Sequence, residues 1–160
     1  MDAAVTSLDK ARLLSLLVPA ALLAGALGSQ YLGGLYPCEM CHWQRWPHYA
    51  AVALAIGSFV RGAADRGRSL VWLAALAIFV SGAIGVYHAG VEMGVFEGVT
   101  ACTASISGQS SADVLANIMA TPIIQCDVPQ WTLFGISLAG FNAILSILGG
   151  LGIIALWRRK

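Results

Sequence analysis

The stretch SLVWLAALAIFVSGAIGVYHAGV, residues 69–91, contains no charged side chain. A helix that crosses the hydrocarbon core of a bilayer needs about 20 predominantly apolar residues. Uncharged runs of similar or greater length cover residues 13–37 and 128–157, and a shorter one covers residues 46–60. The chain is therefore expected to cross a membrane several times.

The composition supports the same class of protein. Of the 160 residues, 58% are hydrophobic and only 11% are charged, against roughly 25% charged residues in a typical soluble domain. We predict an all-α fold, a four-transmembrane-helix bundle that forms a single membrane domain over residues 1–160. The helices are expected at about 13–35, 44–61, 69–90 and 130–157, and the outer loops at about 33–45 and 89–130.

The first uncharged run has an alternative interpretation as a cleaved signal peptide. Lys10 and Arg12 precede it, and Ala26-Leu27-Gly28 resembles a cleavage site. The apolar run nevertheless continues past Gly28 through Leu32. This continuation favours a helix that is retained in the mature protein.

The basic residues predict the orientation of the chain. Cytoplasmic loops of membrane proteins carry an excess of Lys and Arg. Eight of the nine basic residues fall on one side of a four-pass topology: Lys10, Arg12, Arg61, Arg66, Arg68, Arg158, Arg159 and Lys160. Only Arg45 falls on the other side. Both termini are therefore expected in the cytoplasm, and both outer loops in the periplasm if the membrane is the inner membrane of a bacterium.

All four cysteines fall in the predicted outer loops, Cys38 and Cys41 in the first and Cys102 and Cys126 in the second. The outer face of a cell membrane is a compartment in which disulfides persist. Four cysteines form two pairs, and the sequence alone allows three connectivities.

The motif CEMCHW, residues 38–43, fits more than one chemistry. Cys-x-x-Cys-His is the attachment pattern of a c-type haem, but a loop of about a dozen residues is too short to wrap a porphyrin. A four-cysteine zinc site needs converging ligands, and the second pair is widely spaced. A structural disulfide staple leaves the Cys-x-x-Cys beside Arg45 unexplained. These alternatives stay open beside a redox-active disulfide.

The predicted second helix brings Cys41 to a helix terminus. Proline is tolerated in the first helical turn, so Pro47 predicts a helix start near Trp43 to Trp46, with Cys41 just before it. The helix N-terminus and Arg45 would both stabilise a thiolate at Cys41 and make it reactive. The alternative for Arg45 is an anchor to phospholipid headgroups.

The second outer loop predicts a short amphipathic helix. Ser110 to Asp113 resembles a helix start, Val114, Leu115, Ile118 and Met119 recur on one face, and Pro122 ends the pattern. Such a helix would lie on the membrane surface or pack on the bundle. Cys102 and Cys126 bracket it.

Polar residues within the apolar runs are candidates for interhelical contacts or for a site. His88 and Glu92 lie one helical turn apart near an outer end, which suits either a binding site or a hydrogen-bonded pair at a helix interface. Asn142 is expected to form an interhelical hydrogen bond. Gly82 and Gly85 are small residues that let helices approach closely.

A dithiol relay accounts for all four cysteines. A pair in the long loop can meet a soluble thiol protein, and the pair at the membrane surface can meet a lipid-soluble electron acceptor. The sequence carries no flavin or metal motif, so a membrane quinone is the natural acceptor. Neither a metal ion nor a nucleic acid is expected as a partner.

The chain resembles the disulfide bond formation protein B (DsbB) family over its whole length, from the first helix to the last. The matching residues are Pro37-Cys38-x-x-Cys41-x-x-Gln44-Arg45, then Tyr87-His88 with Gly90 and Glu92, then Cys126-Asp127 followed by Trp131, Phe134-Gly135 and Ser137-Leu138. The resemblance implies a four-helix membrane bundle and a thiol:quinone oxidoreductase. More distant relatives of the vitamin K epoxide reductase type usually carry the membrane-proximal Cys-x-x-Cys late in the chain, whereas here it comes early.

The resemblance also implies roles for individual residues. A reduced periplasmic thioredoxin-fold partner of the DsbA type would attack a Cys102–Cys126 disulfide, most often at Cys102. Cys126 would then attack Cys38, and Cys41 would leave as a thiolate and pass electrons to ubiquinone or menaquinone. Arg45 would polarise the quinone. His88 and Glu92 are the further candidates for contact with it.

Overall fold

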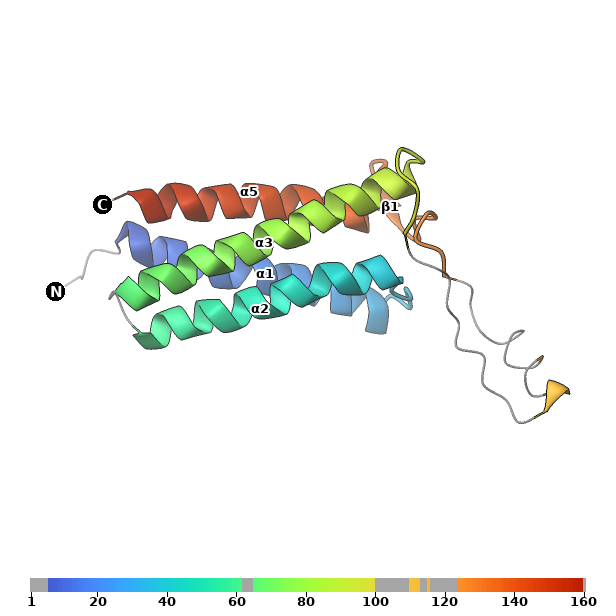
Figure 1. Ribbon diagram of the computed structural model, residues 1–160, viewed down its shortest axis with the longest axis horizontal. Helices are drawn as coiled ribbons and strands as arrows, with labels where there is room; N and C mark the ends of the chain where they lie inside the picture. The colour runs from blue at the N-terminus through green and yellow to red at the C-terminus, as the bar shows by residue number, and fades with distance from the viewer. Residues whose placement is uncertain (1–5, 62–64, 100–109, 113–114, 116–123, 160) are drawn as a thin grey trace.

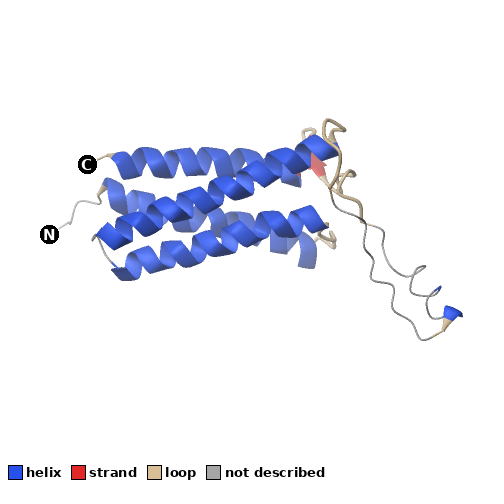
Figure 2. Ribbon diagram, in the orientation of Figure 1, coloured by secondary structure: helices blue, strands red, loops and turns tan. Residues whose placement is uncertain are grey.

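A computed structural model of the chain describes residues 6–61, 65–99, 110–112, 115 and 124–159. Within them, four long helices lie side by side along one axis (Figure 1): α1 (Ser7–Tyr31), α2 (Glu39–Arg61), α3 (Asp65–Glu92) and α5 (Leu138–Arg158). A small antiparallel hairpin, β1 (Thr132–Leu133) and β2 (Ile136–Ser137), precedes α5 (Figure 2). The predicted all-α bundle is confirmed. The N-terminus of α1 and the C-terminus of α5 lie at the same end of it.

Three helices among the described residues are long and apolar enough to cross a membrane. They are α1, α3 and α5, with mean hydropathies of 1.8, 2.2 and 2.0. The helix α2 has the length but not the composition, because its first three turns contain Glu39, His42, Gln44, Arg45 and His48. The predicted count of four spans therefore stays a prediction.

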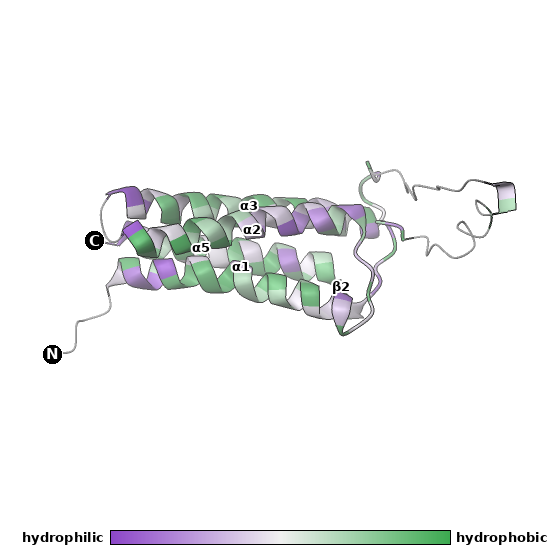
Figure 3. Cartoon of the chain, turned by 90° about the horizontal axis from the view of Figure 1, so that it is seen from below, coloured by the Kyte–Doolittle hydropathy of each residue, from purple (hydrophilic) through white to green (hydrophobic). Residues whose placement is uncertain are grey.

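The outward faces of the bundle are apolar. Large hydrophobic side chains are exposed along all four helices, among them Leu13, Leu17, Ile56, Phe59, Trp72, Leu76, Val80, Ile144, Leu148 and Leu151. Figure 3 shows that apolar residues predominate along the helices. A soluble monomer rarely exposes apolar surface on this scale, whereas lipid would cover it.

The start of α2 differs from the prediction. The helix begins at Glu39 rather than near residue 44. The backbone carbonyl of Cys38 accepts the N–H of His42 at 3.2 Å, and the sulfur of Cys38 accepts the N–H of Cys41, also at 3.2 Å. Cys38 thus caps the helix as a serine or aspartate side chain would, and Cys41 lies inside the first turn instead of before it.

Pro47 misled the prediction because it lies within α2 and not in its first turn. Proline lacks the N–H for the helical ladder. Helices in membranes tolerate this loss where neighbouring helices and polar side chains satisfy the freed groups. Ser81 of α3 supplies a polar contact close to the proline, since its hydroxyl donates to the backbone carbonyl of Gln44 at 2.8 Å.

The other helix ends follow capping signals rather than hydropathy. The helix α1 starts at Ser7 and not near residue 13, because Thr6 and Asp9 form a reciprocal capping box. The helix α5 starts at Leu138 and not near residue 130, because the β1–β2 hairpin occupies the preceding residues.

The hairpin turns tightly before α5. Phe134 and Gly135 both have positive φ, 51° and 77°, as a two-residue turn of type I′ requires. Ser137 then caps α5 by accepting the N–H of Gly140 at 3.1 Å. The hairpin therefore places the start of α5 directly after a chain reversal.

Two sequence predictions fall mainly on residues outside the described part of the chain. One is Cys102. The other is the amphipathic helix expected after Ser110, of which the structure describes only residues 110–112 and 115.

Small residues bring α3 and α5 into close contact, as predicted for Gly82 and Gly85. A Cβ added at Gly85 would lie 3.0 Å from the backbone nitrogen of Ala143 and 3.1 Å from the carbonyl oxygen of Ala139. Backbone atoms cannot move aside as a flexible side chain can. The separation of the two helices therefore depends on the missing side chain.

We expect Gly85→Val to destabilise the bundle by about 1–3 kcal/mol, because the added side chain overpacks a well-filled interface. Gly152→Ala is the matched control, since a Cβ at that α5 glycine meets nothing within 4 Å. Thermal unfolding in detergent measures both. Equal unfolding temperatures for the two variants would show that the helices can separate without cost.

Candidate active site

The site lies at the end of the bundle where α2 begins and α3 ends. Cys38, Met40 and Val91 form a buried cluster there, with exposed fractions of 5%, 0% and 3%. Partly buried side chains pack against the cluster: Cys41, Tyr87, Ile124 and Cys126. Three of the four cysteines of the chain are thus gathered at one point.

Cys38 and Cys41 form the centre of the site. Their sulfur atoms are 2.7 Å apart, because Cys38 at the cap of α2 and Cys41 in its first turn lie on the same side of the helix start. The hydrogen bond with Cys41, together with burial, raises the pKa of the Cys38 thiol. In the reduced pair Cys38 therefore keeps its proton, and Cys41 is the sulfur that ionises first.

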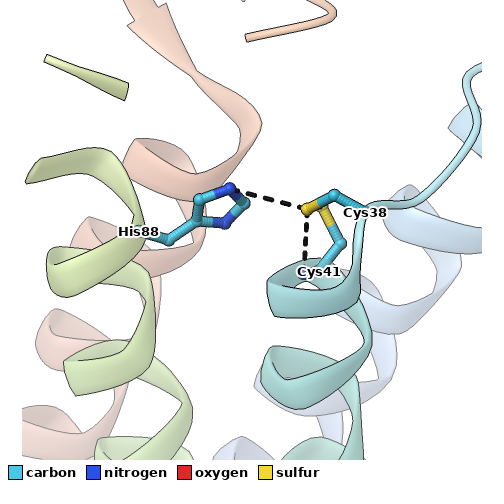
Figure 4. A group of neighbouring side chains, drawn as sticks. All are labelled: Cys38, Cys41 and His88. Atoms are coloured by element: carbon cyan, nitrogen blue, oxygen red, sulfur yellow. Dashed lines mark hydrogen bonds between the residues drawn. The ribbon is translucent and has the colours of Figure 1, made fainter. Parts of the chain in front are cut away.

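The histidine that faces the pair comes from a different helix. His88 of α3 points across to Cys38, with Nε2 3.6 Å from the sulfur (Figure 4). His42, which follows Cys41 in the motif, is exposed. The contact that the structure shows is therefore Cys-x-x-Cys with His88, and the adjacent histidine of the haem pattern takes no part in it.

Glu92 lies behind His88, as the one-turn spacing suggested. Its Oε1 is 3.8 Å from His88 Nε2, and its Oε2 accepts a hydrogen bond from the hydroxyl of Ser137, the cap of α5. The carboxyl group thereby joins the end of α3 to the start of α5. His88 and Glu92 act together at the helix interface and also line the site.

Cys126 reaches the site from the segment before the hairpin. It packs against the cluster of Cys38, and its backbone forms a hydrogen bond with His88. The sequence separation between Cys38 and Cys126 gave no hint of this proximity. The structure thus brings one cysteine of the second pair to the first pair, while Cys102 lies outside the described residues.

Arg45 points into the bundle. Its side chain is only 8% exposed, and its guanidinium donates to Gln30 Oε1 at 2.5 Å and to the carbonyl of Ala26 at 3.0 Å, both in α1. Its charge also acts on Cys41. An arginine held in this way suits the stabilisation of an anion beside Cys41 better than an anchor in the headgroups.

Two cavities adjoin the cysteine pair. A cavity of about 50 Å³ is lined by Cys38, Cys41, His88 and Glu92 among others. A larger one of about 280 Å³ lies between α1, α2 and α5, with Cys41 and Arg45 in its wall. Its apolar lining includes Ala21, Leu22, Leu23, Leu138, Phe141 and Leu145. An apolar cavity with a few polar groups is the usual form of a site for a small organic molecule.

The same atoms offer a set of possible metal ligands. The sulfurs of Cys38 and Cys41 and a ring nitrogen of His88 all lie within 4.8 Å of one another. Thiolate and imidazole are ligands that zinc prefers. Metal binding would need both cysteines reduced, so it and a disulfide between them exclude each other.

The sequence alone did not show how much of the polar lining α2 supplies. Cys41, Gln44, Arg45 and His48 all line the larger cavity, and their spacing of i, i+3, i+4 and i+7 places them on one face of α2. Asn142 of α5 bonds to both Gln44 and His48, so its predicted interhelical hydrogen bond is confirmed. The helical spacing from Cys41 was the signal that could have found Gln44 and His48.

Comparison with known proteins gives the family. A family model described as "Disulfide bond formation protein DsbB" matches residues 9–157. The chain belongs to the DsbB family. Disulfide bond formation protein B of Chromohalobacter salexigens is 33% identical to it, over 92% of both chains. An uncharacterized protein of Rickettsia prowazekii is 24% identical, over 78% of this chain and 73% of its own. No solved structure matches the chain significantly.

Membership of the DsbB family establishes a membrane protein of disulfide bond formation, and it implies disulfide-generating oxidoreductase activity. The geometry agrees with this chemistry. A close pair of cysteines at a helix N-terminus, with a third cysteine beside it, is suited to thiol–disulfide exchange, which needs one sulfur to attack another.

The cap of α2 by Cys38 has a measurable consequence. With excess reductant present, Cys38→Ala should unfold with about 1 kcal/mol less stability than Cys38→Ser, because the serine oxygen can accept the N–H of Cys41 and alanine cannot. Denaturant unfolding in detergent compares them, with Thr6→Ala at the cap of α1 as a benchmark. Equal stabilities would mean that the sulfur does not hold the helix start.

Proposed function

We propose that the chain is a thiol:quinone oxidoreductase of the bacterial inner membrane, which reoxidises a periplasmic thioredoxin-fold thiol oxidase of the DsbA type. One observation carries the proposal. The Cys38–Cys41 pair has Cys126 beside it and an apolar cavity against Cys41 and Arg45. Cys126 suits the entry of electrons from a second disulfide, and the cavity suits their exit to a membrane quinone.

In this proposal all four helices span the membrane and both cysteine loops face the periplasm. The 23 residues of α2 extend over about 35 Å at a rise of 1.5 Å per residue, enough for a bilayer core of about 30 Å. Gln44, Arg45 and His48 of α2 are buried against the three apolar helices around it. The excess of basic residues at the opposite end supports a cytoplasmic location of both termini.

The relay passes two electrons through two disulfides. A thiolate of the partner attacks the Cys102–Cys126 disulfide, and Cys126 is released as a thiolate. Cys126 attacks Cys38, a new Cys38–Cys126 bond forms, and Cys41 leaves with the electron pair of the broken bond. Cys41 is the sulfur that lines the larger cavity, so it is placed to deliver the electrons there.

The larger cavity fits a quinone by its chemistry. Ubiquinone or menaquinone has a planar ring with two carbonyl oxygens and an apolar tail, and its role is to accept two electrons and two protons. The Arg45 guanidinium suits a carbonyl that gains negative charge, and the side chains of α1 and α5 suit the ring and tail. His88 and Glu92, which line the smaller cavity beside the same cysteines, remain the further candidates.

We expect Cys41→Ser to abolish quinone reduction driven by a reduced thioredoxin-fold protein, with a loss of at least about 10³-fold, because the cycle loses a nucleophile. Absorbance of a short-chain ubiquinone follows the reaction. Ser58→Ala, a buried change on the same helix far from the site, should retain full turnover. Full turnover of Cys41→Ser would refute the relay, and a Soret band in the purified protein would favour the haem alternative.

We expect Arg45→Ala to raise the KM for the quinone about tenfold or more while the KM for the thiol partner changes little. The quinone loses a charged hydrogen-bond donor that the thiol partner does not contact. Steady-state kinetics with each substrate varied in turn measures both constants. Arg45→Lys should recover part of the loss, since the charge returns without the paired N–H groups. An unchanged quinone dependence would leave Arg45 with a purely structural role.

A further inference from the structure

A chain of buried polar side chains leads from the larger cavity to the cysteine pair. Its members are His48 and Gln44 of α2, Ser81 and His88 of α3, and Asn142 and Ser146 of α5. Polar groups in an apolar bundle cost free energy unless they are hydrogen-bonded. The chain joins three helices, and the direction of each hydrogen bond in it follows from its neighbours.

Two backbone carbonyls determine how the amide side chains are turned. Nε2 of Gln44 is 3.3 Å from the carbonyl oxygen of Met40, and Nδ2 of Asn142 is 3.2 Å from the carbonyl oxygen of Ser81. A carbonyl oxygen only accepts hydrogen bonds. Each amide must therefore present its NH₂ group to the carbonyl, and its oxygen faces the other way.

The orientation of Gln44 determines which nitrogen of His88 carries the proton. Nε2 of Gln44 has a second hydrogen, and His88 Nδ1 lies 2.7 Å from it. Nδ1 must accept this bond, so in the neutral ring the proton is on Nε2. That N–H lies 3.6 Å from the sulfur of Cys38 and 3.8 Å from Glu92 Oε1, and the backbone of Cys126 also forms a hydrogen bond with the ring.

Asn142 holds Gln44 in this orientation. Nδ2 of Asn142 donates to Oε1 of Gln44 at 2.8 Å. Its Oδ1 lies 2.8 Å from Nε2 of His48 and also accepts from the hydroxyl of Ser146 at 3.2 Å. Donation therefore runs in a single direction, from His48 through Asn142 and Gln44 to His88, whose Nε2 lies near Cys38 and Glu92.

We propose that Gln44 and Asn142 are positioning residues that fix His88 with its Nε2–H directed at Cys38, and that this N–H stabilises the Cys38 thiolate. The role of this N–H in stabilising the thiolate rests on the proposed function. Together with the backbone N–H of Cys41, His88 gives the sulfur two donors.

The Cys38 thiolate arises when the relay resets. Both disulfides must be restored, so the Cys38–Cys126 bond has to be broken again. The Cys102 thiolate, released when the partner departs with its own disulfide, attacks the sulfur of Cys126. The Cys102–Cys126 bond forms, and Cys38 leaves with the electron pair of the old bond. The Cys38 and Cys41 thiolates then form their disulfide as two electrons pass to the quinone, and until that bond forms His88 is the side chain of the site that donates to the Cys38 sulfur.

The first test reads the tautomer without any variant of the chain. In ¹⁵N spectra of the full-length protein with labelled histidine at neutral pH, His88 should show an unprotonated Nδ1 and a protonated Nε2. His88→Ala identifies its signals by their loss. A protonated Nδ1 in the unaltered protein would overturn the proposal.

The second test uses a double-mutant cycle on protein in which Cys41, Cys102 and Cys126 are replaced by serine. Gln44→Met keeps the size of the side chain and removes the donor to His88. We expect it to slow alkylation of Cys38 by iodoacetamide about tenfold, as the loss of a hydrogen bond to a charged group would. In a His88→Ala background the same change should have no further effect, since the two residues act through one interaction.

A control separates this effect from a general loosening of α2. Ser58→Ala removes a buried hydrogen bond of the same helix and should leave alkylation of Cys38 unchanged. If Gln44→Met slows alkylation equally with and without His88, Gln44 does not act through His88 and the proposal is wrong. Neither test involves a quinone or a thiol partner, so a failure of the proposed function and a failure of this inference give different results.

Discussion

The structure depends on one constraint, which is that polar groups enclosed in an apolar bundle must bond to one another. The helix α2 shows its effect most clearly, because it carries Gln44, Arg45 and His48 on a single face. These groups find partners on α1, α3 and α5. The least apolar helix is thereby held by its three neighbours, and its N-terminus is fixed beside the end of α3.

The position of the N-terminus of α2 determines the surroundings of the Cys38–Cys41 pair. Because Cys38 caps α2 and Cys41 lies in the first turn, the two sulfurs meet at the positive end of a helix dipole. His88 and Cys126 face one side of the pair, and the larger cavity adjoins Cys41. The pair therefore has different neighbours on each side, which is the arrangement that the proposed relay requires.

Hydropathy predicted the helical membrane class and the approximate positions of all four helices, and the resemblance of the motifs predicted the family. They did not predict the helix ends. Capping at Thr6 and Cys38 extends α1 and α2 into polar sequence. Hydropathy could not predict this, because it measures apolar character and not the hydrogen bonds that cap a helix. Pro47 was given too much weight, because its effect on a helix depends on whether neighbouring helices satisfy the freed carbonyl.

The sequence by itself determined which residues could do chemistry, since the cysteines, Arg45, His88 and Glu92 could all be identified from motif and spacing. Only the tertiary structure decided which of them meet. It brought Cys126 to Cys38, as the family resemblance implied, and it showed that the distant His88 and not the adjacent His42 contacts the pair. It also set the direction of the hydrogen bonds through Gln44 and Asn142. The physical reason is that spacing along a chain specifies neighbours only within one helix, whereas contacts between helices depend on how small residues and buried polar groups pack.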